Sequence, residues 1–205
     1  TVLAEGQRAL FGFDFAFGYP SGFATRLTDI GRAEAVWYWL SDRIEDGPDN
    51  RNNRFAVASE INARYGGTGP FWSHPAGQTH LHLPRRKADI DFAGLGIGEF
   101  RTVERQVKGA KSPWMLYNPG AVGSQSLLGL PMIHRFSQLA GIEVWPFSAR
   151  SAPVVLAEVY PSLLGDRVGK EMRDFGIEKD RAQVRLLARV LRALSKRGKI
   201  SPLFD

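Results

Sequence analysis

Two apolar runs, each holding a single carboxylate, constrain the fold of this chain more than any other feature. The first run, Arg8–Tyr19, contains Asp14, and the second, Pro153–Tyr160, contains Glu158. Continuous apolar runs of this length are typical of strands that are buried on both faces. Segments with helical spacing separate and follow these runs. The sequence therefore predicts an α/β fold in which helices cover a sheet.

The remaining elements follow from apolar spacing and turn residues. We expect one domain over residues 1–205, with an irregular, loop-rich insertion at about 66–98 that is functional or mobile. A third strand is predicted at Gly141–Phe147. Helices are predicted at Arg32–Ile44, Arg54–Arg64, Glu99–Gly109 and Lys179–Lys196, and within Ala121–Arg135 after Pro131.

Composition excludes several classes of chemistry. The chain has no cysteine, which removes disulfides, cysteine-bound zinc, iron–sulfur clusters and thiol nucleophiles. Its 27 Lys and Arg residues against 21 Asp and Glu residues give a net charge of +6, which permits an anionic partner such as a nucleic acid or nucleotide. With neither a signal peptide nor a long apolar segment in the sequence, we expect a cytoplasmic protein without a membrane partner. The sequence sets no oligomeric state.

The two strand carboxylates are the first candidate site. Asp14 is expected at the carboxyl end of its strand, where open α/β sheets bind ligands, and Glu158 repeats that pattern. Paired acids on adjacent strands bind Mg²⁺ or Mn²⁺, because hard cations prefer carboxylate oxygens. The structural alternatives are that Asp14 caps the next loop and that Glu158 pairs with an arginine at the sheet edge.

Two further acids extend this hypothesis. Asp180 opens the last predicted helix, so it is either an N-cap or a third metal ligand at the same end of the sheet. Glu104 is a candidate fourth acid. Its charged neighbours favour the alternative, a side chain on a solvated helix face.

Two segments are candidate anion sites. The loop Asn118–Ser126 is rich in glycine and hydroxyl groups, which is typical of phosphate-binding turns and also of tight structural turns. The last helix carries a basic stripe that either follows a phosphate backbone or is an ordinary solvated face. The candidate residues are Gly123, Ser124, Gln125 and Ser126 in the loop, and Arg181 and Arg185 in the helix.

The histidines form a third cluster. His80 and His82 alternate, which predicts one face of a strand, and His74 is close in sequence. Because no acid lies at a typical ligand spacing, a metal site at these histidines is the weaker hypothesis.

Four segments together form a familiar combination: Gly12–Pro20, Arg101–Glu104, Glu158–Pro161 and the helix that Asp180 opens. They resemble a large uncharacterised family of predicted nucleases with a ribonuclease H-like fold. The loop from Asn118 to Pro131 is similar to that of a bacterial subgroup sometimes labelled as molybdopterin-guanine dinucleotide synthesis proteins.

The resemblance implies a mixed sheet flanked by helices. Such domains normally begin with a hairpin whose first strand carries a metal-binding aspartate. No aspartate precedes Asp14 in this sequence, so either the domain lacks this first hairpin and its metal ligand, or both lie upstream of Thr1.

Together these features predict a nuclease-like phosphodiesterase. Asp14 and Glu158 would bind Mg²⁺ or Mn²⁺ with help from Asp180 or Glu104. One alternative is a non-catalytic module that binds a nucleotide or RNA through the loop Ser124–Ser126 and the basic helix. A second is an enzyme of pterin or nucleotide cofactor metabolism, with stacking surfaces from Trp37, Trp39, Trp72 and Trp114.

Overall fold

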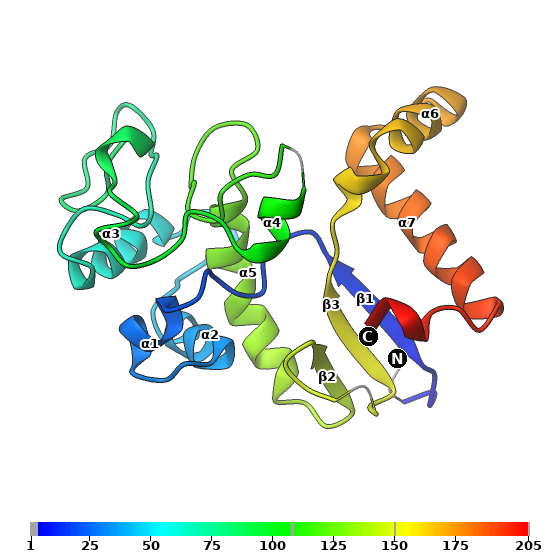
Figure 1. Cartoon of the computed structure of the whole chain (residues 1–205). Helices are drawn as coiled ribbons and strands as arrows, with labels where there is room; N and C mark the ends of the chain where they lie inside the picture. The colour runs from blue at the N-terminus through cyan, green and yellow to red at the C-terminus, as the bar shows by residue number, and fades with distance from the viewer. Residues whose placement is uncertain (1–3, 108, 150, 205) are drawn as a thin grey trace.

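A small parallel sheet is the centre of the fold. The computed structural model describes residues 4–107, 109–149 and 151–204. Strands β1 (Ala9–Phe13), β2 (Ile142–Trp145) and β3 (Val154–Glu158) pair in the order β1-β3-β2, and both pairings are parallel (Figure 1). The α/β class is confirmed. This described sheet is purely parallel, which differs from the mixed sheet that the family resemblance implied.

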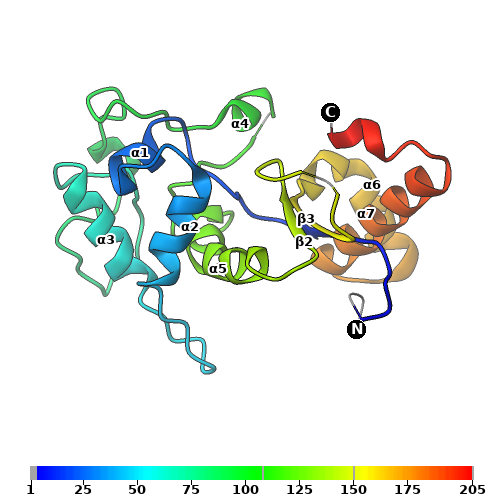
Figure 2. The same ribbon diagram turned by 90° about the horizontal axis from the view of Figure 1, so that it is seen from below.

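Helices flank the two faces of this sheet. Val154 and Leu156 are buried on one face together with Val144 of β2, next to α5 (Val122–Ser137). On the opposite face, Leu10 and Val155 line a cavity below α7 (Lys179–Lys196). Figure 2 shows this layering, with α5 on one side of the strands and α7 on the other.

The main core lies on the α5 side and is rich in aromatic rings. It is enclosed by α1 (Phe23–Thr28), α2 (Ala33–Ser41), α3 (Arg54–Arg64) and α5. Its largest fully buried side chains are Trp37, Trp114, Tyr65, Phe17, Phe23 and Phe71. These rings stack or meet edge to face, which adds to the free energy gained from burial of their area.

The segment 66–98 runs over this core with little regular structure. Its one helical turn is η1 (Lys87–Asp89), and Trp72 forms an isolated bridge with Met115. His80 and His82 lie in this loop rather than on a strand, so the strand predicted from their alternation is wrong. The side-chain amide of Asn62 donates hydrogen bonds to the backbone carbonyls of Phe71 and His82, and these bonds hold the loop where strand pairing does not.

The C-terminal helices form a separate layer. After β3 come η2 (Pro161–Leu164), α6 (Gly165–Phe175), α7 and η3 (Ser201–Phe204). The buried carboxylate of Glu171 on α6 forms ion pairs with Arg185 and Arg189 on α7, and it accepts a hydrogen bond from Arg189. These contacts join α6 and α7 into a helical hairpin.

Several predicted boundaries differ from the structure. The first strand ends at Phe13 rather than Tyr19, since the chain bends at Asp14 and Phe15. Helix α5 begins at Val122 and continues through Pro131, although the sequence predicted a start after that proline. Burial of Leu127, Leu130 and Ile133 on both sides of Pro131 compensates for the lost hydrogen bond. Helices α1 and α6 were not predicted.

Candidate functional site: an acidic cluster at the carboxyl ends of β1 and β3

The register of the parallel strands brings the candidate acids to one edge. Phe13 pairs with Glu158 at the last position of both strands, so Asp14 leaves the sheet beside Glu158. Parallel strands end at the same edge, and this edge is where open α/β sheets bind their ligands. The placement predicted for Asp14 and Glu158 is therefore the one observed.

Arg101 is the central cation of this edge. Its Nη1 donates to Glu158 Oε2 at 2.8 Å, and its Nη2 contacts Glu158 Oε1 in parallel. Its Nε donates to Glu104 Oε1 at 2.8 Å, and Nη2 also contacts that oxygen. The backbone N–H of Phe17 donates to Glu158 Oε2 at 3.0 Å. The arginine pairing considered for Glu158 is thus present, and Arg101 supplies it.

Glu104 is buried inside this network. It belongs to α4 (Thr102–Gln106), and its Oε2 accepts the backbone N–H of Arg101 at 2.8 Å as part of a capping box. The sequence favoured a solvated helix face for Glu104, and that interpretation is wrong. The charged residue three positions before Glu104, Arg101, is its ion-pair partner, so this charge pattern reflects a contact within the network.

Asp14 lies beside these groups with an exposed side chain. Partial burial raises the pKa of the Asp14 carboxyl, and repulsion from Asp180 and Glu158 raises it further, while Lys179 acts in the opposite direction. The charges of three predicted acids therefore interact at this edge. Asp180 lies in the first turn of α7, whose N-cap is Glu178 rather than Asp180.

The donor set of this edge suits a hard cation in part. Asp14 and Asp180 offer carboxylate oxygens, whereas Glu158 and Glu104 are already bound by Arg101. Across the described ranges, no three His, Cys, Asp or Glu side chains are close enough together to bind a metal ion without rearrangement.

The glycine- and serine-rich loop uses its hydroxyl groups internally. Ser124 Oγ donates to Leu116 O at 2.6 Å and accepts from Arg54, and Ser126 Oγ donates to Val122 O. A Cβ on Gly123 would lie 2.6 Å from Pro113 O, so close backbone packing requires glycine there. Of the four candidates, Gln125 is exposed. Gly123 to Ser126 belong to the first turns of α5 rather than to a loop, and these contacts favour a structural role for them.

The basic stripe of α7 divides into two parts. Arg185 binds Glu171 at 3.0 Å and lies over the Phe175 ring, so it joins α7 to α6. Arg181 is exposed in the first turns of the helix, close in sequence to Asp180. Only Arg181 of this pair therefore combines exposure with a position next to the acidic edge.

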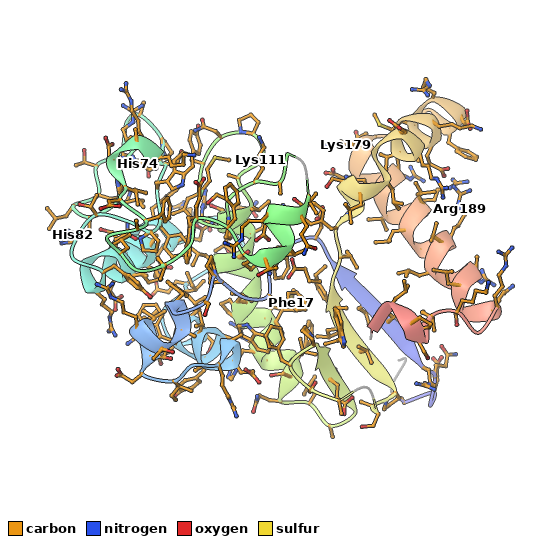
Figure 3. All side chains as sticks on the ribbon, in the orientation of Figure 1. Phe17, His74, His82, Lys111, Lys179 and Arg189 are labelled. Atoms are coloured by element: carbon orange, nitrogen blue, oxygen red, sulfur yellow. The ribbon has the colours of Figure 1, made fainter. Side chains whose placement is uncertain are left out.

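The histidines and tryptophans lie elsewhere. His74 and His82 are in the lobe around α3, while Lys179 is at the far side of the molecule beside α6 (Figure 3). The ring centroids of His74 and His80 are 5.3 Å apart, and burial together with His74 lowers the pKa of His80. Trp37, Trp39 and Trp114 are buried in the core, so they offer no stacking surface.

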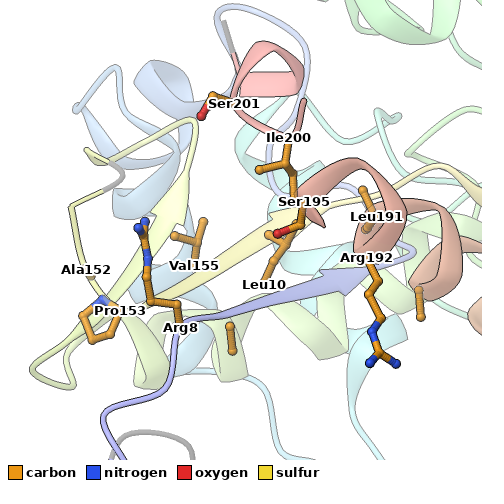
Figure 4. A pocket seen from close by; sticks show the side chains of 12 residues that line it. Arg8, Leu10, Ala152, Pro153, Val155, Leu191, Arg192, Ser195, Ile200 and Ser201 are labelled. Atoms are coloured by element: carbon orange, nitrogen blue, oxygen red, sulfur yellow. The ribbon is translucent and has the colours of Figure 1, made fainter. Parts of the chain in front are cut away.

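A cavity of about 770 Å³ lies between the sheet and α7, away from the acidic edge (Figure 4). Leu10, Val155 and Leu191 form its apolar walls, and Arg8 and Arg192 also line it. None of the four predicted acids lines this cavity.

Comparison with protein-family models, curated proteins and solved structures gave no match. Within the ranges that the structure describes, no helix is long and apolar enough to cross a membrane.

Proposed function

We propose that this chain hydrolyses phosphodiester bonds with the help of a divalent metal ion at the carboxyl ends of β1 and β3. One observation carries the proposal. The parallel register of β1 and β3 brings Asp14 beside Glu158 at the carboxyl edge of the sheet, and repulsion from Asp180 and Glu158 adds to partial burial in raising the pKa of Asp14. A divalent cation relieves this repulsion, and carboxylate oxygens are the ligands that Mg²⁺ and Mn²⁺ prefer.

The residues present fit such an ion in part, because Asp14 and Asp180 offer carboxylates while Arg101 binds Glu104 and Glu158. Mg²⁺ in phosphoryl-transfer sites is often held by one or two carboxylates, with water and substrate phosphates completing its shell. Asp14 and Asp180 supply two carboxylates. Glu158 remains a candidate third ligand, because a carboxylate offers about four lone-pair positions and Arg101 and Phe17 use only part of them.

The surrounding residues have separate roles in this proposal. The bound metal ion would activate water and neutralise charge on the phosphate. Arg101 fixes the orientation of Glu158 through paired contacts. Lys179 and Arg181 are exposed beside Asp180 and would attract the phosphate groups of a nucleic acid.

The test is hydrolysis of bis-p-nitrophenyl phosphate and of a fluorescent single-stranded RNA, each with Mg²⁺, Mn²⁺ or EDTA. We expect activity with either metal, none with EDTA, and at least a hundredfold loss in Asp14→Asn. Asp89→Asn is the matched control, because Asp89 is an exposed aspartate on η1 in the opposite lobe. This control should keep full activity.

Two other outcomes would replace the proposal. RNA binding that needs no metal and survives Asp14→Asn, without hydrolysis, would favour the non-catalytic binding module. Thermal stabilisation by a pterin or nucleotide cofactor, without phosphodiester hydrolysis, would favour the small-molecule enzyme.

A further inference from the structure

Strand β1 is an unprotected edge of the sheet. Its sequence, ALFGF, has no charged residue and no proline, and no described strand pairs with its outer side. The N–H of Ala9 donates to Pro153 O, and the C=O of Phe13 accepts from Val159 N. Both residues therefore direct their backbone groups toward β3. The intervening Leu10 and Gly12 therefore direct their N–H and C=O groups outward. Phe11 is 44 % exposed although it lies on the face that packs on the core.

The opposite edge, at β2, is protected by its own chain. The N–H of Val144 donates to Ser148 Oγ at 2.8 Å, and Val144 O accepts from Ser148 N at 3.0 Å. Strand β2 also carries Glu143 and is followed by Pro146. A charge within an edge strand disfavours edge-to-edge pairing, and β1 itself carries none, while the residues that flank it, Arg8 and Asp14, have opposite charges.

We propose that β1 pairs with β1 of a second copy of this chain, in antiparallel orientation about a two-fold axis. Pairing must use the outward groups of Leu10 and Gly12, which limits the register to three choices. One register places Leu10 opposite the partner's Gly12 and Phe11 opposite the partner's Phe11. A six-stranded sheet results, and the exposed Phe11 rings cover each other.

Charge selects this register over the other two. Arg8 then lies opposite the partner's Asp14, which gives two opposite-charge pairs. A shift by two residues one way places Arg8 opposite the partner's Gly12, and a shift the other way places Asp14 opposite the partner's Leu10. The register centred on Phe11 is the one that pairs apolar with apolar and charge with charge.

The pairing also adds a cation to the acidic edge. Within one chain, the cation that acts on Asp14 is Lys179. In the dimer, Arg8 of each copy would also lie next to Asp14 of the other copy. A five-residue strand pair buries little area, so we expect a weak dimer with a dissociation constant on the order of micromolar.

The test is the molar mass in solution, from sedimentation velocity at about 1 to 100 μM protein. We expect the wild type to shift from monomer to dimer over this range and Phe11→Lys to stay monomeric, because two lysines would face each other. Leu163→Lys is the matched control, since Leu163 is 64 % exposed on η2, and it should dimerise normally. Circular dichroism confirms that each variant is folded.

Charge reversal tests the register itself. Arg8→Asp and Asp14→Arg should each weaken the dimer at least tenfold, and the double variant should restore it. A wild type that stays monomeric throughout, a Phe11→Lys variant that still dimerises, or a double variant without rescue would each overturn the proposal. These experiments measure molar mass and not hydrolysis. A failure of the dimer proposal is therefore distinguishable from a failure of the proposed function.

Discussion

Arg101 and Glu158 lie 57 residues apart in the chain, and the guanidinium of the first contacts both carboxylate oxygens of the second. This pair joins α4 to the carboxyl end of β3. Burial alone would lower the pKa of Arg101, but the hydrogen bonds that it donates to Glu158 and Glu104 outweigh burial and raise this pKa above its usual range.

Removing the charge of Arg101 should destabilise the fold. Arg101→Gln leaves Glu104 and Glu158 without their cation, and both carboxylates are largely shielded from water. We expect a loss of about 3 kcal/mol in the free energy of unfolding, measured with urea. Arg105→Gln is the control, because Arg105 is exposed on the same helix. An equal loss in both variants would contradict a specific role for Arg101.

Asp14 should make stability depend on pH. Because its pKa is raised in the folded protein, the folded state holds this proton more tightly than the unfolded state. Asp14 therefore does not lower the free energy of unfolding at pH values below its ordinary pKa of 3.8. It lowers the free energy of unfolding by the full amount at pH values above the raised pKa. Asp14→Asn should be more stable than wild type at pH 7, and the difference should vanish near pH 3. A difference that is independent of pH would contradict this electrostatic account.

The sequence predicted the sheet edge because its signals are local. An apolar run with one acid identifies a strand and its carboxylate, and parallel strands then bring Asp14 and Glu158 together. The sequence did not predict that Arg101 pairs with Glu158, because the pairing depends on how the chain folds over 57 residues. Burial of Glu104 was missed for the same reason, since charged neighbours are typical of solvated helices.

Gly129 should be required by packing rather than by backbone conformation. It lies within α5, where Gly→Ala normally stabilises a helix by about 1 kcal/mol. A Cβ there would lie 2.4 Å from the Phe15 ring, so we expect Gly129→Ala to cost about 1 to 3 kcal/mol. Gly165→Ala at the start of α6 meets no atom within 4 Å and should be neutral or stabilising. Thermal unfolding of both variants gives the comparison.

The same packing explains why the sequence predicted the start of α5 too late in the chain. The sequence suggested that Gly129 and Pro131 precede the helix, since both residues disfavour helical interiors. In the folded protein, the Phe15 ring occupies the space that a side chain at Gly129 would fill. Tertiary contacts of this kind are absent from any local pattern.

Arg181 and Arg185 should respond differently to substitution. Arg181→Ala should weaken binding of a single-stranded oligonucleotide and lower the slope of log affinity against log salt by about one, as expected for one lost phosphate contact. Arg185→Ala removes a partner of Glu171, so it should increase hydrogen exchange in α6 and α7. If Arg181→Ala leaves the salt slope unchanged, this residue does not contact phosphate.

Binding of one divalent metal ion by Asp14 and Asp180 is the centre of the proposed function. Titration of Mn²⁺ followed by electron paramagnetic resonance measures this directly, because bound Mn²⁺ loses its sharp free-ion signal. We predict one bound Mn²⁺ per chain in the wild type and in Asp89→Asn, and none at the same concentrations in Asp14→Asn or Asp180→Asn. Equal Mn²⁺ binding in all four proteins, or none in the wild type, would contradict the account.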